Sequence, residues 1–527
     1  MPDIKKLLFE DLTKQQIEAV KSSKRRVLII AGAGSGKTEV MARRIAWWVG
    51  VEGVSKDQIV AFTFTDRAAE EMKFRIRSWI GKITPEGEDI SLGGMYIGTI
   101  HGYCLAKIRE FWPDDYHNFD ILDEGGRAAL ILREFNFLLA LNGLRKALPK
   151  RKDGSDTSQS DTFDQFTLAY DQLQEHNRFD VQLPDSIPPV ELGEAEKDWC
   201  RQAKLLTDVG SSEEAKAFAV SAARYYAYLR CRRFLDFSTS QSEFIRRLEA
   251  DTTRQMALQK ANVHLVVDEI QDINPVQMQL IRLLTDKSGK LTTVGDHRQA
   301  IYGFRGAKVE LIGELWEEFH KDKAAKVVDL QENFRSTPRI VDVANRWAGT
   351  IGPVGTMQTP DMKHGNKGRT DHHASHVALI GFPDRIDESR WIADAIREIV
   401  PTEAQGALHD KREGQHRGLA LSDVAILVRS STDVRTYMKA LEEAGIPSIV
   451  RAGPDLFSQP EVLFFVGALG ITAGIDKFMG SSIGNKSMPT RASSVLQCDP
   501  DPEPILRAAA RQLRSSQLPL SREAEDR

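Results

Sequence analysis

The 527-residue sequence has little cysteine, no excess of positive charge and no long apolar run. Its four cysteines lie far apart and match no zinc or disulfide spacing, which predicts reduced thiols. No segment approaches the eighteen or so apolar residues of a membrane span, and the N-terminus lacks a signal cleavage site. We therefore expect a cytoplasmic protein with no membrane partner. With a net charge of -4, any nucleic-acid binding must come from a local groove.

The stretch from Arg26 to Val49 contains an apolar, β-branched run, a glycine-rich loop and an apolar pattern of helical spacing, in that order. The run Val27–Ile30 is typical of a strand buried on both faces of a parallel sheet. Glycines let several backbone N–H groups face one anion, and the helix N-terminus adds partial positive charge. We expect a loop that binds the phosphates of ATP or GTP, the alternative being a plain glycine turn. The loop residues are Ala31, Gly32, Ala33, Gly34, Ser35, Gly36, Lys37 and Thr38.

Within this loop, Lys37 is expected to bridge the β- and γ-phosphates, and the Thr38 hydroxyl to bind Mg²⁺. A second predicted strand, Val263–Val267, ends in Asp268 and Glu269. Two acids at this position suit Mg-ATP hydrolysis, with Asp268 holding the metal and Glu269 orienting and deprotonating the attacking water. An acidic turn capping the next helix is the alternative.

Other strand ends carry hydroxyl, imidazole and aromatic groups. The predicted strands Ile59–Thr65 and Tyr96–Gly102 end where α/β sheets place ligand contacts. A further strand, Leu291–Asp296, precedes Gln299, whose neutral amide can hydrogen-bond a γ-phosphate. Aromatic faces after it can stack on single-stranded bases, although core packing is as good a reading for Phe64. The candidates for nucleic-acid contact are Phe64, Thr65, Thr99, His101, Tyr302 and Phe304.

Two shorter signals complete the candidate site. Thr13 is a plausible N-cap of a helix in which Gln16 can read the hydrogen-bonding edges of adenine. After the predicted strand Val327–Leu330, Arg335 stands at the head of a new α/β unit. An arginine there can reach across a cleft to the γ-phosphate and couple closure to chemistry.

Seven blocks in order carry a resemblance across roughly residues 8 to 470: LTKQQIEAV, AGAGSGKT, FTFTDRAAEEM, GTIHGYC, VVDEIQD, VGDHRQAIYGFRGA and ENFRSTPRIV. The chain resembles the UvrD/Rep/PcrA group of superfamily I DNA helicases. The resemblance implies a motor that hydrolyses ATP between two RecA-like domains, steps 3′ to 5′ along single-stranded DNA and separates duplex. It implies that Gln16 meets adenine and Phe334 stacks on it. The implied hydrolytic set is Lys37, Thr38, Asp268, Glu269, Gln299 and Arg335, and the implied DNA track is Phe64, Thr99, His101, Tyr302 and Phe304.

The expected fold is α/β: a P-loop (RecA-like) parallel sheet domain with an inserted helical domain, plus a second, incomplete RecA-like domain. The expected divisions are residues 1–108 and 235–325 for the first motor domain, 109–234 for the insertion, 326–470 for the second domain and 471–527 for an irregular tail. In the insertion, the run Arg224–Arg233 with interleaved tyrosines could lie on a nucleic-acid backbone, or form an exposed helix face. In the second domain we expect strands at Val377–Phe382 and Val424–Val428 and helices at Glu388–Val400 and Thr432–Glu443.

The sequence also departs from the family pattern. Glu39 follows the loop threonine where a basic residue is frequent, which predicts an altered grip on the nucleotide. Two later blocks, of the "HAAKGLE" and "VALTRA" types, do not occur. We therefore expect a truncated or split member, with a downstream segment or partner chain supplying those blocks. A module that binds ATP and DNA without stepping, and a P-loop ATPase acting on protein partners, are the alternatives.

Overall fold

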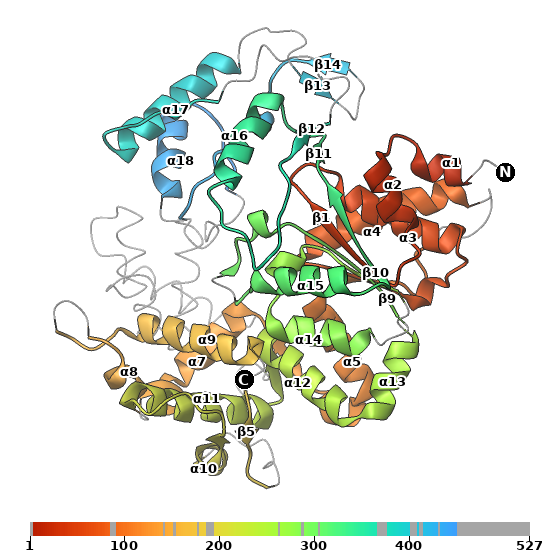
Figure 1. Ribbon diagram of the computed structural model, residues 1–527. Helices are drawn as coiled ribbons and strands as arrows, with labels where there is room; N and C mark the ends of the chain where they lie inside the picture. Colours follow the sequence, from red (N-terminus) through yellow and green to blue (C-terminus); the bar gives the residue numbers. More distant parts are fainter. Residues whose placement is uncertain are drawn as a thin grey trace, which may run out of the picture. The chain divides into compact units, whose positions relative to one another are not determined.

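The computed structural model (Figure 1) describes residues 4–84, 91–140, 143–150, 154–176, 179–185, 194–261, 264–285, 289–303, 306–365, 377–400, 408–410, 415–430 and 433–450. The predicted tail, 471–527, and Phe304 lie outside these ranges. The chain forms two compact units, Met1–His376 and Val377–Arg527. Within the described ranges, no helix combines the length and apolar character needed to cross a bilayer.

A six-stranded parallel sheet forms the centre of the first unit, in the order β10-β1-β9-β8-β2-β3. Side chains of β1 alternate between two cores: Val27 and Ile29 face one, and Leu28 and Ile30 face the other. The prediction of a strand buried on both faces is confirmed. The six strands are β1 Arg26–Ala31, β2 Ile59–Thr63, β3 Tyr96–Thr99, β8 His264–Val267, β9 Lys290–Gly295 and β10 Ala325–Leu330.

Helices cover both faces of this sheet. One layer consists of α1 Ile4–Phe9, α2 Lys14–Lys21, α3 Lys37–Gly50 and α4 Asp66–Ile83. The other consists of α5 Ile100–Phe111, α12 Phe237–Ala250, α13 Thr252–Ala261, α14 Pro275–Leu284 and α15 Glu310–Lys321. Thr13 caps α2 as predicted: its hydroxyl accepts from the Gln16 N–H, while the Gln16 side chain accepts from the Thr13 N–H.

Strand β10 lies at the edge of this first sheet and pairs with β1. From the sequence, residues 326–330 of this strand are expected at the start of the second domain. Short strands follow, β11 Glu332–Asn333 paired with β12 Lys363–His364, and so does helix α16 Pro338–Ala348. The first compact unit therefore includes the segment that carries Phe334 and Arg335.

The segment inserted between β3 and β8 is mainly helical and has its own apolar core. It leaves and rejoins the sheet domain through the parallel pair β4 Asp120–Leu122 and β7 Phe234–Asp236. Its other elements are α6 Pro113–Tyr116, α7 Glu124–Arg133, a π-helix Asn136–Ala140, α8 Leu144–Ala147, α9 Gln159–Glu175, β5 Val181–Gln182, α10 Glu194–Gln202, β6 Lys204–Leu205 and α11 Glu213–Cys231. Three cysteines, Cys104, Cys200 and Cys231, are free and buried.

Both readings of the run Arg224–Arg233 as a surface are wrong, because its tyrosines are buried. Tyr225, Tyr226 and Tyr228 are 0%, 7% and 2% exposed. Arginine and tyrosine are mixed along this helix, so its sequence does not indicate which face is exposed to solvent and which is packed. The aliphatic parts of its arginines and the rings of its tyrosines pack inside the insertion instead.

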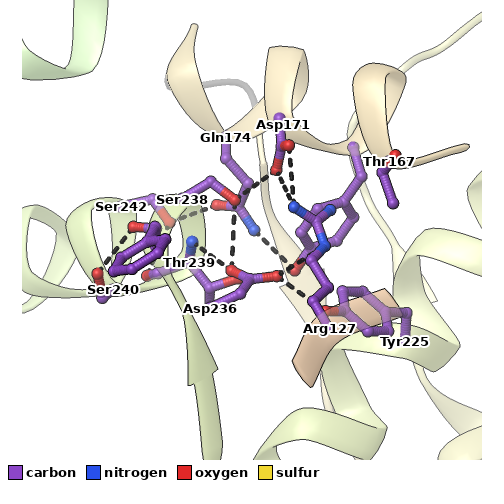
Figure 2. Close-up of polar contacts among 12 residues, drawn as sticks. Arg127, Thr167, Asp171, Gln174, Tyr225, Asp236, Ser238, Thr239, Ser240 and Ser242 are labelled. Atoms are coloured by element: carbon purple, nitrogen blue, oxygen red, sulfur yellow. Dashed lines mark hydrogen bonds and ion pairs between the residues drawn. The ribbon is translucent and has the colours of Figure 1, made fainter. Parts of the chain in front are cut away.

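A buried polar network joins the insertion to α12 (Figure 2). Arg127 on α7 donates to both carboxylate oxygens of Asp171 on α9, at 2.8 and 2.9 Å, and its Nε lies 3.5 Å from Asp236. Asp236 accepts from Tyr225 at 2.9 Å and from the Thr239 N–H at the start of α12. The network is called the Arg127 cluster below, and it links α7, α9 and α11 of the insertion to the start of α12.

The second unit contains α17 Arg385–Ile399 and α18 Val434–Glu443, close to the predicted helices, and the hairpin β13 Leu408–Asp410 with β14 Gln415–Arg417. The predicted strands Val377–Phe382 and Val424–Val428 are wrong: both segments are described without strand structure. Leu379 and Leu427 are almost fully exposed there. An apolar run becomes a strand only where a neighbour pairs with its backbone.

Candidate functional site

The predicted phosphate-binding loop connects β1 to α3 and turns on two left-handed glycines. Gly34 and Gly36 have φ angles of +69° and +81°, which other residues adopt only with strain. No side chain caps the start of α3, so the N–H groups of its first turn face the loop. This backbone has the form that an anion site needs, and phosphate binding itself stays a prediction.

Lys37, Glu269 and Gln299 meet beside this loop, although 232 and 262 positions separate the two later residues from Lys37. Lys37 Nζ lies 2.9 Å from Glu269 Oε2 and 3.4 Å from Gln299 Oε1. Glu269 follows β8, and Gln299 ends a short helix after β9. An isolated glycine turn and an unrelated acidic turn would not meet in this way, so the geometry favours the hydrolytic reading of both motifs.

Asp268 is buried at the end of β8, and its Oδ1 accepts from the Glu269 N–H at 2.9 Å. Burial raises the pKa of Asp268 to about 7, and the negative charge of Glu269 adds to this rise, while Lys37 opposes it. A nearby divalent cation would favour the ionised carboxylate. The donor chemistry of Asp268 therefore fits the predicted magnesium.

The predicted base contacts, Gln16 and Phe334, line one small cavity of about 50 Å³ next to the loop. The Gln16 amide is 5% exposed and already engaged at both ends. Its Oε1 accepts from Thr13 and its Nε2 donates to the Ser35 carbonyl at 3.0 Å. Contact with adenine would therefore add to, or replace, bonds that now hold α2 against the loop.

Asn333, which the sequence analysis missed, fixes the predicted arginine finger on the loop. Its Nδ2 donates to the Ala33 carbonyl at 2.7 Å, and its Oδ1 accepts from the N–H groups of Arg335 and Ser336. A Cβ at Gly34 would lie 2.8 Å from the Arg335 Cβ, so Arg335 sits directly beside the loop. The signal was available, because asparagine commonly bonds the backbone two or three residues ahead.

The predicted nucleic-acid contacts lie at the ends of β2 and β3. The rings of Phe64 and Tyr302 are in contact, with centroids 4.4 Å apart and planes tilted by 37°. Phe64 is only half-buried, so pure core packing does not describe it. The Thr65 and Thr99 hydroxyls cap α4 and α5 by accepting backbone N–H groups. Burial lowers the pKa of His101 to about 4, so at neutral pH it offers a neutral imidazole.

A cavity of about 520 Å³ extends from these strand ends to the insertion. Phe64, Thr65, Thr99 and His101 all line it. Among the lining residues that the structure describes, Arg127 is the one arginine or lysine, and two carboxylates already pair with it. The acidic lining residues are Asp66, Asp123, Glu124, Asp171, Glu175, Asp236, Asp268 and Asp272. An acidic lining of this kind does not favour contact with phosphates.

Glu39 points away from the predicted nucleotide contacts and organises helix packing. Its Oε1 accepts from Arg43 at 2.7 Å and from the Trp79 indole at 2.9 Å. Arg43 in turn lies over the Trp79 ring, 4.1 Å from its centroid. The departure from the family pattern at Glu39 thus joins α3 to α4, whereas the sequence analysis expected it to alter the grip on the nucleotide.

Comparisons with known proteins agree with these motifs. Residues 12–320 match the UvrD/REP helicase N-terminal domain, and residues 328–473 match the UvrD-like helicase C-terminal domain. The chain is 30% identical to DNA helicase II of Haemophilus influenzae, 29% to DNA helicase II of Escherichia coli and 26% to ATP-dependent DNA helicase PcrA of Staphylococcus epidermidis. These alignments cover 88%, 86% and 88% of this chain but 54%, 53% and 54% of the relatives. The chain thus spans about half the length of the curated relatives it matches.

Proposed function

Because the chain belongs to the UvrD/REP helicase family, we propose that it binds ATP with Mg²⁺ and hydrolyses it to move 3′ to 5′ on single-stranded DNA and unwind duplex. The relatives named above are DNA helicases, and each is about twice as long as the matched part. The activity of this chain is therefore inferred from its own residues as well as from its family.

The observation that carries the proposal is the meeting of Lys37, Glu269 and Gln299 at the end of β8 and β9. A cation, a carboxylate and a neutral amide in one place match the needs of phosphoryl transfer: charge neutralisation, water activation and detection of the γ-phosphate. Lys37 pairs with Glu269. Phosphate oxygens would compete for Lys37, and Glu269 would then be available to a water molecule.

Thr38 and Asp268 are the residues that would hold Mg²⁺. Bound there with ATP, the metal would neutralise charge on the β- and γ-phosphates. Gln16 and Phe334 would hold the base, and Arg335, placed by Asn333, would reach the γ-phosphate. The half-buried, tilted ring pair of Phe64 and Tyr302 supports the proposal that bases of the DNA strand stack here, at about 1–3 kcal/mol per base. Phe304 belongs to the same proposal on sequence alone.

A DNA-stimulated ATPase assay together with strand displacement tests this function. Hydrolysis that rises with single-stranded DNA, accompanied by unwinding of a duplex with a 3′ single-stranded tail, is the expected result. Binding of nucleotide and DNA without turnover would instead select the second reading, a module that needs a further segment or partner chain. Hydrolysis indifferent to DNA would contradict the DNA-motor proposal and favour an ATPase that acts on proteins.

The Glu269→Gln variant separates binding from chemistry. Loss of the carboxylate should slow single-turnover ATP hydrolysis about 100- to 10,000-fold, because general-base catalysis contributes a factor of this size. ATP affinity, measured by calorimetry, should change little. Undiminished hydrolysis would remove Glu269 from its proposed role. A matched control is Glu314→Gln on α15, a glutamate of no proposed function.

A further inference from the structure

Gln271 is a buried amide of the VVDEIQD block, and none of the roles proposed above uses it. It lies in the short helix Ile270–Asp272 after β8 and is 1% exposed. Its Nε2 donates to Glu269 Oε2 at 2.9 Å and to Asp272 Oδ2 at 3.2 Å, and its Oε1 accepts from the Asp296 N–H at 3.0 Å. Both ends of the amide are thus engaged, one by the proposed catalytic base and one by the backbone after β9.

These bonds close a ring around the candidate site. The Asp296 carboxylate accepts from Gln299 Nε2 at 2.8 Å, Gln299 Oε1 lies 3.4 Å from Lys37 Nζ, and Lys37 pairs with Glu269. Through Gln271, the segment that carries Gln299 is therefore linked to the Glu269 carboxylate. A movement of Gln299 toward a γ-phosphate would pull on Asp296, and through Gln271 on Glu269.

Glutamine suits this position for two reasons. It is a neutral side chain that donates to a carboxylate and accepts from a backbone N–H at the same time, whereas another carboxylate would repel Glu269 and Asp272. The space is also shaped for it, since a Cβ at Gly295 would overlap the Gln271 Oε1 atom. Glu269 itself has a left-handed φ of +49°, which a non-glycine residue keeps only where its surroundings hold it.

We propose that Gln271 is a positioning residue, which holds the Glu269 carboxylate in place and couples it to the γ-phosphate-sensing segment 296–299. This inference rests on the proposed ATP hydrolysis. Gln271 touches neither nucleotide nor water in this scheme and acts through Glu269. It therefore affects the chemical step and leaves nucleotide affinity to the loop.

Two substitutions test the donor and the whole amide separately. Gln271→Glu keeps the length and an acceptor for the Asp296 N–H but removes the donor to Glu269, and Gln271→Met removes both. We expect each to slow single-turnover hydrolysis about 10- to 100-fold, the range seen when a group that orients a reactive ligand is lost. The dissociation constant for ATP should stay within about threefold. Hydrolysis at the unchanged rate in both variants would overturn the proposal.

Gln174→Met is the matched control, because Gln174 is also a 1% exposed glutamine with both amide ends bonded, to Tyr170 and Ser242 in the Arg127 cluster (Figure 2). Its thermal stability should fall to an extent similar to that of Gln271→Met, while its hydrolysis should stay at the wild-type rate. Equal losses of hydrolysis in the two variants would mean that general destabilisation explains the effect, which would also overturn the proposal.

A double-mutant cycle with Glu269→Gln identifies the path of the effect. If Gln271 acts through Glu269, adding Gln271→Met to Glu269→Gln should not slow the residual hydrolysis further. Additive losses would show that Gln271 acts independently and would overturn the inference. Failure of the wild-type chain to hydrolyse ATP would instead be a failure of the proposed function, since every comparison here is made relative to that rate.

Discussion

The group around Lys37 and the Arg127 cluster each place one cation against two carboxylates, yet they differ in what surrounds them. The side chains of Lys37 and Glu269 are 13% and 32% exposed and border the phosphate-binding loop. In the Arg127 cluster, the side chains of Arg127, Asp171 and Asp236 are 11%, 31% and 1% exposed, and Asp236 accepts hydrogen bonds from tyrosine, serine and backbone groups. The pairs Lys37–Glu269 and Arg127–Asp171 are thus about equally exposed, and the difference is the enclosed Asp236. A carboxylate enclosed in this way depends on its partners for stability, whereas a carboxylate at an open site can exchange its partner for a ligand.

The largest effect that this comparison predicts comes from Lys37→Ala. Loss of the cation should reduce ATP hydrolysis about 100- to 1000-fold, because charge on the γ-phosphate is then no longer neutralised. Steady-state ATPase assays measure this. The folded state should persist, as judged by its melting temperature. Lys73→Ala, which removes a surface lysine paired with Glu70 on α4, is the control, and equal activity of the two variants would contradict the assignment.

For Arg127→Met, the expected effect is a loss of stability. Removing the cation leaves the enclosed Asp236 and the partly exposed Asp171 without their partner, which should lower the free energy of unfolding by about 3–5 kcal/mol. Burial already raises the pKa of Asp171, and Arg127 opposes that rise. Urea denaturation measures the loss, with Lys216→Met at an exposed ion pair as the control. Equal stability of the two variants would contradict the stabilising role assigned to the Arg127 cluster.

A smaller loss follows from Tyr225→Phe, which keeps the packed ring but removes the hydroxyl that donates to Asp236. A hydrogen bond to a charged group is worth about 1.5–3 kcal/mol, so urea denaturation should show a loss below that of Arg127→Met. A loss larger than for Arg127→Met would indicate that the tyrosine, rather than the arginine, organises the cluster.

The smallest effect concerns pH. An unfolded histidine takes up a proton near pH 6.5, whereas burial lowers the pKa of His101 and of His264 to about 4. Between these values the unfolded chain binds more protons, so stability should fall as pH drops from 6.5 toward 4. His101→Gln should flatten the dependence of the urea midpoint on pH in this window. An unchanged slope would show that His101 is protonated in the folded protein.

The comparison also indicates where sequence reasoning succeeds. The site residues at strand ends, such as Lys37, Glu269 and Gln299, could be predicted because a parallel sheet brings the carboxyl ends of its strands to one edge. The strands and helices of the first sheet follow from apolar runs of the right length. Thr13 could be identified as a cap from local pattern alone.

What could not be predicted depends on contacts between distant segments. Tyr225 is buried because α11 packs inside the insertion. The sequence of this helix fits a solvent-exposed face equally well. Strand β10 pairs with β1 in the first sheet. A local sequence pattern can predict a strand, but it does not show which strand will be its partner. Val377–Phe382 has a strand-like composition but no strand structure. Gln271 and Asn333 lie in quoted sequence blocks, but the hydrogen-bond partners that give them a role, at both ends of each amide, are known only from the structure.

Hydrogen exchange with and without a non-hydrolysable ATP analogue and Mg²⁺ tests the central claim most directly. If the triphosphate lies against the loop, the amides of residues 33–38 and of 268–269 should gain protection together, and Lys37→Ala should abolish both changes. Protection confined to other segments, with residues 33–38 unchanged, would contradict the account.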